Sequence, residues 1–167
     1  MKQLAIINPE NSSEEEIKNY SVREAARAIV VDDEGKIALL HVSKANYYKL
    51  PGGGLEGSED KIVALERECQ EEIGCDIEVT GEVGIVVEYR KFCKLKQISY
   101  CYLAKVKGKK GKPNFTDKEI ENGFEEVWLS FDEARKALNE SNADSIEGKL
   151  YIVPRDLILL KEAKSAI

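Results

Sequence analysis

Hydrophobic residues dominate or alternate with polar ones along five stretches of the chain, which is typical of β-strands. These stretches are residues 22–31, 36–42, 76–90, 97–106 and 124–129. The first is apolar on almost every position, as in a strand buried on both faces. Asp32-Asp33-Glu34-Gly35 is a turn sequence, so we expect the first two stretches to form a hairpin, and we expect an interruption of the third near Gly81.

A second pattern, with a period near 3.6 residues, predicts a helix over Glu59–Ile73. Ser58 is the predicted N-cap of this helix, and Gly74 follows its last residue in the position that favours a left-handed backbone. At roughly 100° per residue, one face of the helix is apolar and carries Ile62, Leu65, Cys69 and Ile73.

Two more helices are predicted in the last third of the chain. Ser130-Phe131-Asp132-Glu133 is a capping box that opens a helix to about Asn139, and Pro154 is a favoured first-turn residue for a helix that runs to Ala166. Strands and helices in this mixture imply an α/β layered domain. We expect one domain over residues 1–167, with residues 1–20 as a peripheral N-terminal segment.

The Glu59–Ile73 helix also carries an acidic ridge. Glu68 lies three and four residues before Glu71 and Glu72, so the three carboxylates are neighbours on one side of the helix. Like charges at this spacing destabilise a helix, and a hard divalent cation would turn the repulsion into binding. A solvated acidic face is the plain alternative for such a ridge considered by itself.

A glycine-rich loop precedes the acidic helix. Pro51-Gly52-Gly53-Gly54 cannot continue a regular element, and its glycines let a ligand or another backbone approach closely. The fixed distance between this loop and the acidic ridge favours a binding site over a solvated face.

Gly53, then Glu59 after five residues, then Arg67-Glu68-Cys69-Gln70-Glu71-Glu72-Ile73-Gly74-Cys75 after seven more, resembles the Nudix box, G-x5-E-x7-R-E-U-x-E-E-x-G-U, where U is a bulky aliphatic residue. Every fixed charged residue and both glycines are in register. The departures are Cys69 and Cys75 at the U positions, and cysteine behaves there as a small buried hydrophobe. The resemblance implies a Nudix-type α/β/α sandwich with a mixed β-sheet.

The resemblance also implies roles for the box residues. Glu68 and Glu72 would be the principal ligands of Mg²⁺ or Mn²⁺, with Glu71 as a shared ligand and the Gly52 carbonyl as a further oxygen donor. Arg67 would orient a carboxylate, either Glu59 or Glu71, instead of touching the substrate.

The general base is left open. A box glutamate such as Glu68 or Glu71 can serve, and similar proteins commonly supply one more glutamate from a loop before the last strand, for which Glu119 and Glu121 are the candidates.

The substrate would lie against the strand and the loop before the box. Arg27 stands in an apolar strand, where an unpaired guanidinium is costly, so it either pairs with a carboxylate or lines the substrate site. Lys49 is a candidate for phosphate contact, Tyr47 and Tyr48 either stack on the substrate or fill the edge of the core, and Gly53 allows close approach.

Composition limits the function further. The 167 residues carry a net charge of −6, which argues against a protein that holds nucleic acid by counterion release. The apolar runs are too short to span a bilayer, the N-terminus lacks the features of a signal peptide, and the four cysteines show neither C-x-x-C pairing nor a companion histidine cluster. We therefore expect a reduced, cytoplasmic protein with a small-molecule nucleotide substrate and neither a nucleic-acid nor a membrane partner, as a monomer or a homodimer.

Two weaker signals receive a structural interpretation. His41 is the only histidine, without a nucleophile motif nearby, and is expected to pack or to lie at the surface. Lys107–Pro113 is a basic loop that we expect to be a solvated hairpin tip.

The sequence thus predicts a metal-dependent pyrophosphohydrolase that cleaves a nucleoside diphosphate linked to another moiety X, which includes nucleoside triphosphates as in MutT-like proteins. The alternative is a non-catalytic Nudix-fold module that binds a nucleotide as a regulatory ligand, since a fold does not imply an activity.

Overall fold

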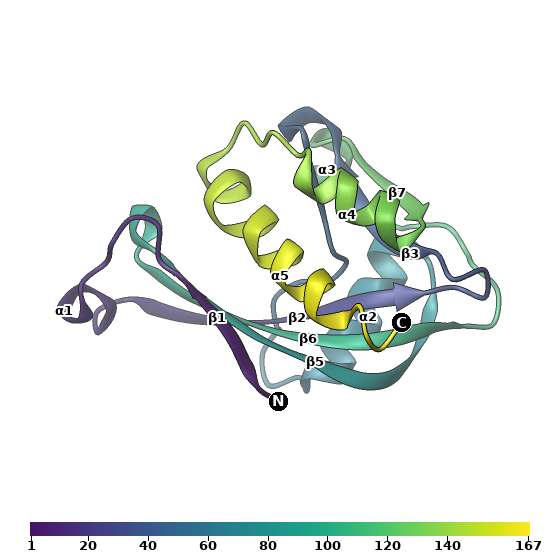
Figure 1. Cartoon of the computed structure of the whole chain (residues 1–167), viewed down its shortest axis with the longest axis horizontal. Coiled ribbons are helices and arrows are strands. Elements are labelled where there is room, and N and C mark those ends of the chain that lie inside the picture. Colours follow the sequence, from purple (N-terminus) through teal and green to yellow (C-terminus); the bar gives the residue numbers. More distant parts are fainter.

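The computed structural model describes all 167 residues and is built on one seven-stranded mixed β-sheet (Figure 1). The strand order is β1-β5-β6-β2-β3-β4, with β7 paired to β3. Long central strands form the sheet, because β2, β5 and β6 are rich in β-branched and aromatic residues. The strands are β1 (Gln3–Ile7), β2 (Ser21–Val31), β3 (Ile37–Val42), β4 (Tyr47–Lys49), β5 (Asp76–Arg90), β6 (Leu95–Lys107) and β7 (Phe124–Leu129).

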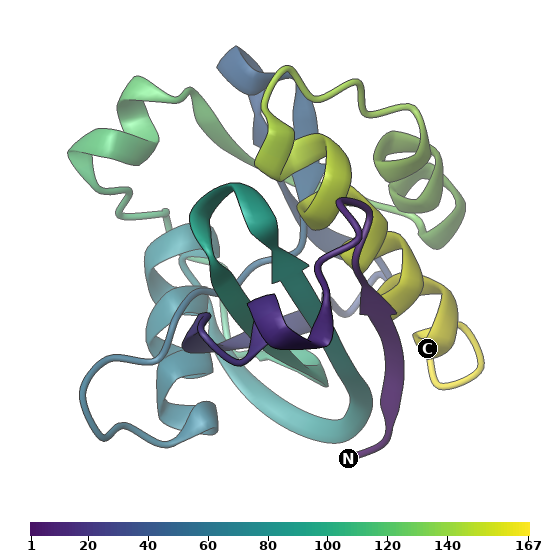
Figure 2. The ribbon, with the colours of Figure 1, turned by 90° about the vertical axis from the view of Figure 1, so that its left-hand side faces the viewer.

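Helices cover both faces of the sheet, as Figures 1 and 2 show for α2 on one side and α5 on the other. The helices are α1 (Glu14–Ile17), α2 (Lys61–Ile73), α3 (Asp117–Glu121), α4 (Phe131–Asn139) and α5 (Val153–Ala163), and a π-helical turn over Gly148–Ile152 leads into α5. Short 3₁₀ turns at Ser43–Ala45 and Lys91–Cys93 link neighbouring strands. No helix is both long and apolar enough to cross a membrane.

Strand alternation divides the core into two main layers. On β6, Tyr102 and Ala104 pack with α2, whereas Cys101 and Leu103 pack with α4 and α5. This confirms the expected mixed β-sheet between helical layers. All four cysteines are free, and three of them are buried in these layers.

Strands β2 and β3 diverge soon after their turn, which decides where the glycine-rich loop lies. The predicted turn forms, but the strands pair only at Val31 and Ile37, so the expected hairpin is almost entirely open. The loop takes the vacated edge of β2: Ala26 N donates to the Gly53 carbonyl and Ala28 N to the Pro51 carbonyl, both at 3.0 Å.

Gly52 is required for this approach. Its φ is +124°, and a Cβ added there would lie 2.2 Å from the carbonyl oxygen of Ala26. A residue with a side chain would therefore push the loop away from β2.

Helix boundaries follow the sequence with three corrections. Helix α2 begins at Lys61 and is capped by Asp60, whose side chain accepts from Ile62 N, so neither the predicted start at Glu59 nor the Ser58 cap is right. Gly74 ends the helix with φ +62°, as predicted. Helix α4 has the predicted capping box and bounds, while α5 starts one residue before Pro154 and ends at Ala163, short of Ala166.

Two segments attach to the rest of the fold in ways that the sequence did not indicate, although residues 107–112 are solvent-exposed as expected. Residues 3–7 lie at the periphery, but as the edge strand β1, which runs parallel to β5 with Ala5 opposite Val86. The basic segment Lys107–Pro113 is not a hairpin tip: it crosses the end of α2, where Gly111 N donates to the Gly74 carbonyl at 2.8 Å.

Candidate functional site

A cleft of about 310 Å³ opens where β2 diverges from β3 and β4. It is lined by the glycine loop and by side chains from β2, β4, β7, α2, α3 and the start of α5. Glu68 and Glu72 reach it from α2, and Arg27 reaches it from β2 on the opposite face of the sheet. The cleft therefore has an acidic wall and a basic wall, with the glycine loop between them.

Glu72 is the buried member of the acidic ridge, with a relative exposure of 1%. Its Oε1 accepts from Lys49 Nζ at 2.7 Å and its Oε2 accepts from the backbone N–H of Gly52 at 2.6 Å. Burial raises the pKa of Glu72, and Lys49 opposes that rise. Glu72 thus fixes the glycine loop onto α2, and Lys49, a candidate for phosphate contact, pairs with this carboxylate.

Glu68 and Glu71 form the more accessible part of the ridge. The Glu68 carboxylate packs against Gly53, where an added Cβ would lie 2.1 Å from its Oε1. The side chain of Glu71 is 40% exposed, and its pKa is raised by partial burial and then by the charge of Glu68. Negative charge at this place is therefore only partly compensated.

Arg67 joins the acidic groups. Its guanidinium contacts Glu59 Oε1 at 2.8 Å, Glu68 Oε1 at 2.9 Å and Glu71 Oε2 at 3.5 Å, and it donates to the Gly54 carbonyl at 3.2 Å. Both carboxylates that the sequence offered as its partners, Glu59 and Glu71, are within reach. The pKa of Arg67 is raised, chiefly by its hydrogen bond to Glu59.

The acidic wall fits a hard divalent cation in its chemistry, although it is not closed around one. No three carboxylate, histidine or cysteine side chains lie close enough together to hold a metal ion. Glu68 and Glu71 each contact Arg67 through one oxygen and keep the other without a partner, although Glu71 does not itself line the cleft. Both oxygens of Glu72 are engaged, by Lys49 and Gly52 N, and the Gly52 carbonyl accepts from Arg27 Nη1. Glu68 and Glu71 are thus the donors most ready to receive Mg²⁺ or Mn²⁺.

The other residues predicted from the sequence divide into those that line the cleft and those that do not. Tyr47, and not Tyr48, lines the cleft, because alternation along β4 sends Tyr48 towards α4, where it stacks on His41 with ring centroids 4.5 Å apart. Glu119 lines the cleft and caps α3 by accepting from Thr116 N at 2.8 Å, while Glu121 does not line it. The prediction that His41 packs or lies at the surface is confirmed.

Arg27 resolves one of the open alternatives. It is 6% exposed, no carboxylate lies within 4.0 Å of it, and it lines the cleft. Burial lowers its pKa to about 10, and the nearby charge of Arg155 adds to that effect. The residue belongs to the cleft and is not one half of an ion pair.

Sequence analysis missed two charged residues that line the cleft, Arg155 and Glu147. One signal was available for Arg155: Arg155-Asp156 interrupts the apolar run from Leu150 to Leu160, and charges at buried helical positions need a reason. Glu147 carries no comparable signal, because it is an exposed residue between a hydrophobic residue and a glycine.

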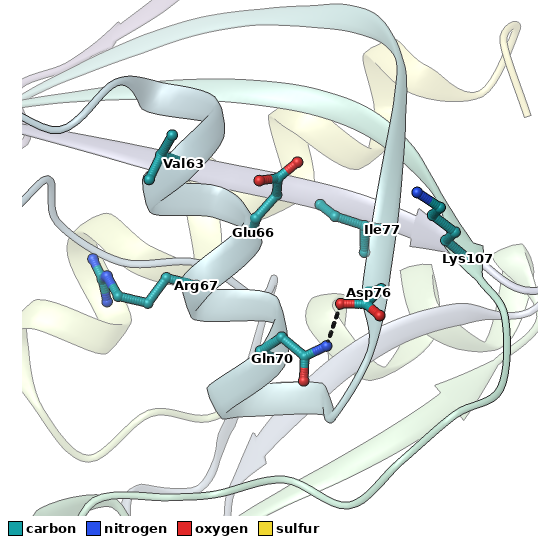
Figure 3. Close-up of a pocket in the computed structure, with 7 residues that line it drawn as sticks. All are labelled: Val63, Glu66, Arg67, Gln70, Asp76, Ile77 and Lys107. Carbon is teal, nitrogen blue, oxygen red and sulfur yellow. Dashed lines mark hydrogen bonds between the residues drawn. The ribbon is translucent and has the colours of Figure 1, made fainter.

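A separate depression of about 510 Å³ lies on the outer side of α2 (Figure 3). Gln70 Nε2 donates to Asp76 Oδ1 across it, and the side chain of Arg67 points away from the other side chains drawn there. Glu66 marks this outer side, whereas Glu68 and Glu72 lie in the cleft on the inner side. The helix therefore has one acidic side that belongs to the site and one that does not.

Known proteins share this fold. The family model of the NUDIX domain matches residues 22–148. A NUDIX hydrolase from Nitrosomonas europaea is 19% identical with a TM-score of 0.65, over 87% of this chain and 90% of that one. A MutT NUDIX hydrolase from Burkholderia pseudomallei is 20% identical with a TM-score of 0.59, over 86% and 99%.

An ADP-ribose pyrophosphatase from Streptococcus suis 89-1591 is 18% identical with a TM-score of 0.55, over 87% of this chain and 94% of that one. A search among curated proteins found no match. At these identities the solved structures show a shared fold, while the domain match covers most of the chain and includes Arg23, Arg27, Glu68 and Glu72 of the cleft but not Arg155. The chain therefore belongs to the Nudix family.

Proposed function

We propose that this protein is a divalent-metal-dependent pyrophosphohydrolase that cleaves the diphosphate linkage of a nucleoside diphosphate joined to a further moiety X. The observation that carries the proposal is the position of the Glu68 carboxylate, which lies against Gly53 of the glycine loop with Glu71 beside it. A diphosphate that follows the loop would meet acceptor oxygens arranged for a bridging cation.

Each residue then has a role in handling a highly charged substrate. Glu68 and Glu71, joined by Glu72, would hold Mg²⁺ or Mn²⁺, and Lys49 would exchange its bond to Glu72 for a substrate phosphate. When bound, the ion neutralises phosphoryl oxygens and makes a bound water more acidic. Arg67 keeps the carboxylates in place through its contacts with Glu59 and Glu68.

Glu119 is the proposed base, or the group that orients the attacking water. It reaches the cleft from α3, opposite the α2 ridge, and its charge contributes to the raised pKa of Glu71. A general base must lie within hydrogen-bond reach of the water that it activates, and α3 is a short helix in a connecting segment that can supply this approach. Among the box residues, Glu68 remains the other candidate.

The names of similar solved structures support a nucleotide substrate but do not identify which nucleotide it is. Solved structures with this fold include an ADP-ribose pyrophosphatase and a UDP-X diphosphatase, the latter 16% identical with a TM-score of 0.58 over 96% of this chain and 68% of that one.

The test uses Glu68→Gln with Glu66→Gln as the matched control. Both glutamates are on α2, but Glu66 is exposed on the outer side of the helix. Phosphate or pyrophosphate release would be measured on a panel of nucleoside triphosphates, dinucleoside polyphosphates, sugar nucleotides and ADP-ribose with Mg²⁺ or Mn²⁺. We expect Glu68→Gln to lose about a thousandfold in kcat/KM or more with unchanged thermal unfolding, and Glu66→Gln to retain activity.

Near-normal turnover by Glu68→Gln would refute the assignment. Tight nucleotide binding without product release from any member of the panel would instead identify a regulatory nucleotide-binding module.

A further inference from the structure

The basic wall of the cleft lies on the α5 face of the sheet, within a layer of charged groups that are buried except for Arg23 and Glu147. The layer contains four guanidinium groups, those of Arg23, Arg27, Arg90 and Arg155, and three carboxylates, those of Glu88, Glu147 and Asp156. Counting one charge for each group, the layer has one positive charge in excess.

All three carboxylates are committed to two of the arginines. Arg90 pairs with Glu88 at 2.8 Å and with Glu147, and Arg155 Nε donates to Asp156 Oδ1 at 2.7 Å. Arg155 also approaches Glu88, at 3.6 Å. No carboxylate is left for the other two guanidinium groups.

Arg23 and Arg27 have only neutral partners. Arg23 Nη1 donates to the side-chain oxygen of Gln97 at 2.9 Å, and Arg27 Nη1 donates to the Gly52 carbonyl. Since Arg27 is almost fully buried, its charge carries a desolvation cost, which Asp156 and Glu72 reduce only from a distance because neither lies within 4.0 Å of it.

A donor group also remains without an acceptor at this place. Arg27 Nε is enclosed and makes no hydrogen bond, whereas Arg155 Nη1 faces Glu88 Oε1 at 3.6 Å; both arginine side chains line the cleft. Tyr47 lies beside them, since the charges of Arg155 and Arg27 both act on its pKa, and it lines the same cleft. An enclosed guanidinium N–H without an acceptor, beside a second arginine, is the complement of an oxyanion.

We propose that Arg27 and Arg155, with Arg23 beside them, form a subsite for a phosphate group of the substrate, beyond the linkage that is cleaved. The subsite begins one peptide away from the acidic wall, because Gly52 donates its N–H to Glu72 and offers its carbonyl to Arg27. It therefore selects substrates whose X moiety carries its own phosphate, such as a triphosphate chain, over those in which X is an uncharged sugar. This inference rests on the proposed function for its substrate class, but the anion site itself does not require turnover.

The size and burial of the subsite restrict the ligand to a small one. The cleft has a volume of about 310 Å³ and Arg155 is 1% exposed, so the phosphate backbone of a folded nucleic acid cannot reach these groups. A single phosphate or a short phosphate chain can.

The direct test is calorimetric binding of inorganic tripolyphosphate in EDTA, where bound metal does not contribute. Arg27→Met removes the guanidinium, and Arg135→Met is the matched control on the exposed side of α4, where the arginine side chain is 64% exposed. We expect Arg27→Met to weaken tripolyphosphate binding about ten- to a hundredfold, as expected for loss of charge-assisted hydrogen bonds, and Arg135→Met to leave it unchanged. Arg155→Met also breaks buried ion pairs, so Arg27→Met is the primary variant and circular dichroism verifies that it is folded.

The second measurement is the ratio of kcat/KM for a nucleoside triphosphate to that for a nucleoside diphosphate sugar with the same base. The ratio is expected to exceed one in the parent protein and to fall about tenfold or more in Arg27→Met. A purely structural role for Arg27 would lower both values together and leave the ratio unchanged.

The outcomes separate the two proposals. Absence of tripolyphosphate binding by the parent protein, or equal binding by Arg27→Met and Arg135→Met, overturns the anion subsite even if nucleotides are hydrolysed. Loss of binding in Arg27→Met alone supports the subsite even if no nucleotide is turned over, in which case only the proposed hydrolysis fails.

Discussion

The two walls of the cleft carry opposite charges and are built in different ways. The two glutamates of the acidic wall, Glu68 and Glu72, and their neighbour Glu71 come from five successive residues of α2, and Glu68 and Glu71 keep contact with solvent. The arginines of the basic wall come from β2 and α5, separated by more than a hundred residues of chain, and two of them are almost fully buried. The acidic wall is a local feature, and the basic wall exists only in the folded protein.

The difference teaches what a mutation on each wall should disturb. Removing an accessible carboxylate relieves repulsion and should spare the fold, so its effect falls on activity. Removing a partner from the buried layer leaves an uncompensated charge, so its effect falls on stability first. The following variants test this contrast, from the largest expected effect to the smallest.

Asp156→Asn tests the buried layer. Asp156 is fully buried, holds Arg155 through Oδ1 and accepts from Leu50 N through Oδ2 at 2.8 Å. Loss of its charge should lower the free energy of unfolding by about 3 kcal/mol and the melting temperature by roughly 6–12 °C.

The control is Asp132→Asn, whose side chain is 82% exposed beside Arg135. Its unfolding free energy should stay within about 0.5 kcal/mol of the parent value in thermal or urea unfolding. Equal stability of the two variants would show that the basic wall is not held by its ion pairs.

Gly53→Ala tests the acidic wall without changing any charge. The new methyl group would collide with the Glu68 carboxylate, which can move because it is the end of a flexible side chain. We expect kcat/KM to fall about a hundredfold, which corresponds to about 2.7 kcal/mol of transition-state stabilisation, with the melting temperature nearly unchanged.

Gly81→Ala provides the comparison, since a methyl group there meets nothing within 4 Å. Tripolyphosphate binding in EDTA should be unaffected by Gly53→Ala if the two walls act separately. A large loss of stability in Gly53→Ala would mean that the Glu68 side chain cannot move aside and that the acidic wall is as rigid as the basic wall.

Glu71→Gln should stabilise the protein slightly at neutral pH. The pKa of Glu71 is raised, so the folded state disfavours its ionised form, which lowers stability above the unfolded-state pKa and ceases to do so as the pH falls below it. Because the side chain is 40% exposed and solvent screens the charge, the gain at pH 7 should be below about 1 kcal/mol.

The gain from Glu71→Gln should disappear below about pH 4, where glutamate is protonated in both states. Thermal unfolding of the parent and the variant at both pH values measures it. A destabilised variant at pH 7 would show that the Arg67 contact outweighs burial and the repulsion from Glu68.

The sequence was informative where the physics is local. The alternation on β6, the capping box at Ser130 and the left-handed Gly74 depend on nearest neighbours along the chain, and each is found as predicted. The spacing of Glu68, Glu71 and Glu72 on a helix is of the same kind. The N-cap at Asp60 was missed because Ser58 and Asp60 are both good caps, and only the path of the preceding loop chooses between them.

Non-local features were not predictable in this way. Arg27 had two possible fates, and the outcome depended on the carboxylates of β5 and α5 already being paired with Arg90 and Arg155. The side on which Tyr48 lies depended on the pairing of β4 with β3, which a three-residue strand does not specify by itself. The basic segment at residues 107–113 lies against α2 because β6 ends there, and its composition contains no sign of this.

Gly52 gives the molecule a mechanical link between chemistries of opposite sign. One residue is restrained by a carboxylate at its N–H and by a guanidinium at its carbonyl, and its backbone tolerates no side chain. If a bound ligand displaces Glu72 or Arg27, the displacement is therefore transmitted to the other side chain through Gly52, over only a few bonds. A change in ligand affinity at one wall is expected to change the affinity at the other wall in the same direction, although no side chain contributes to both.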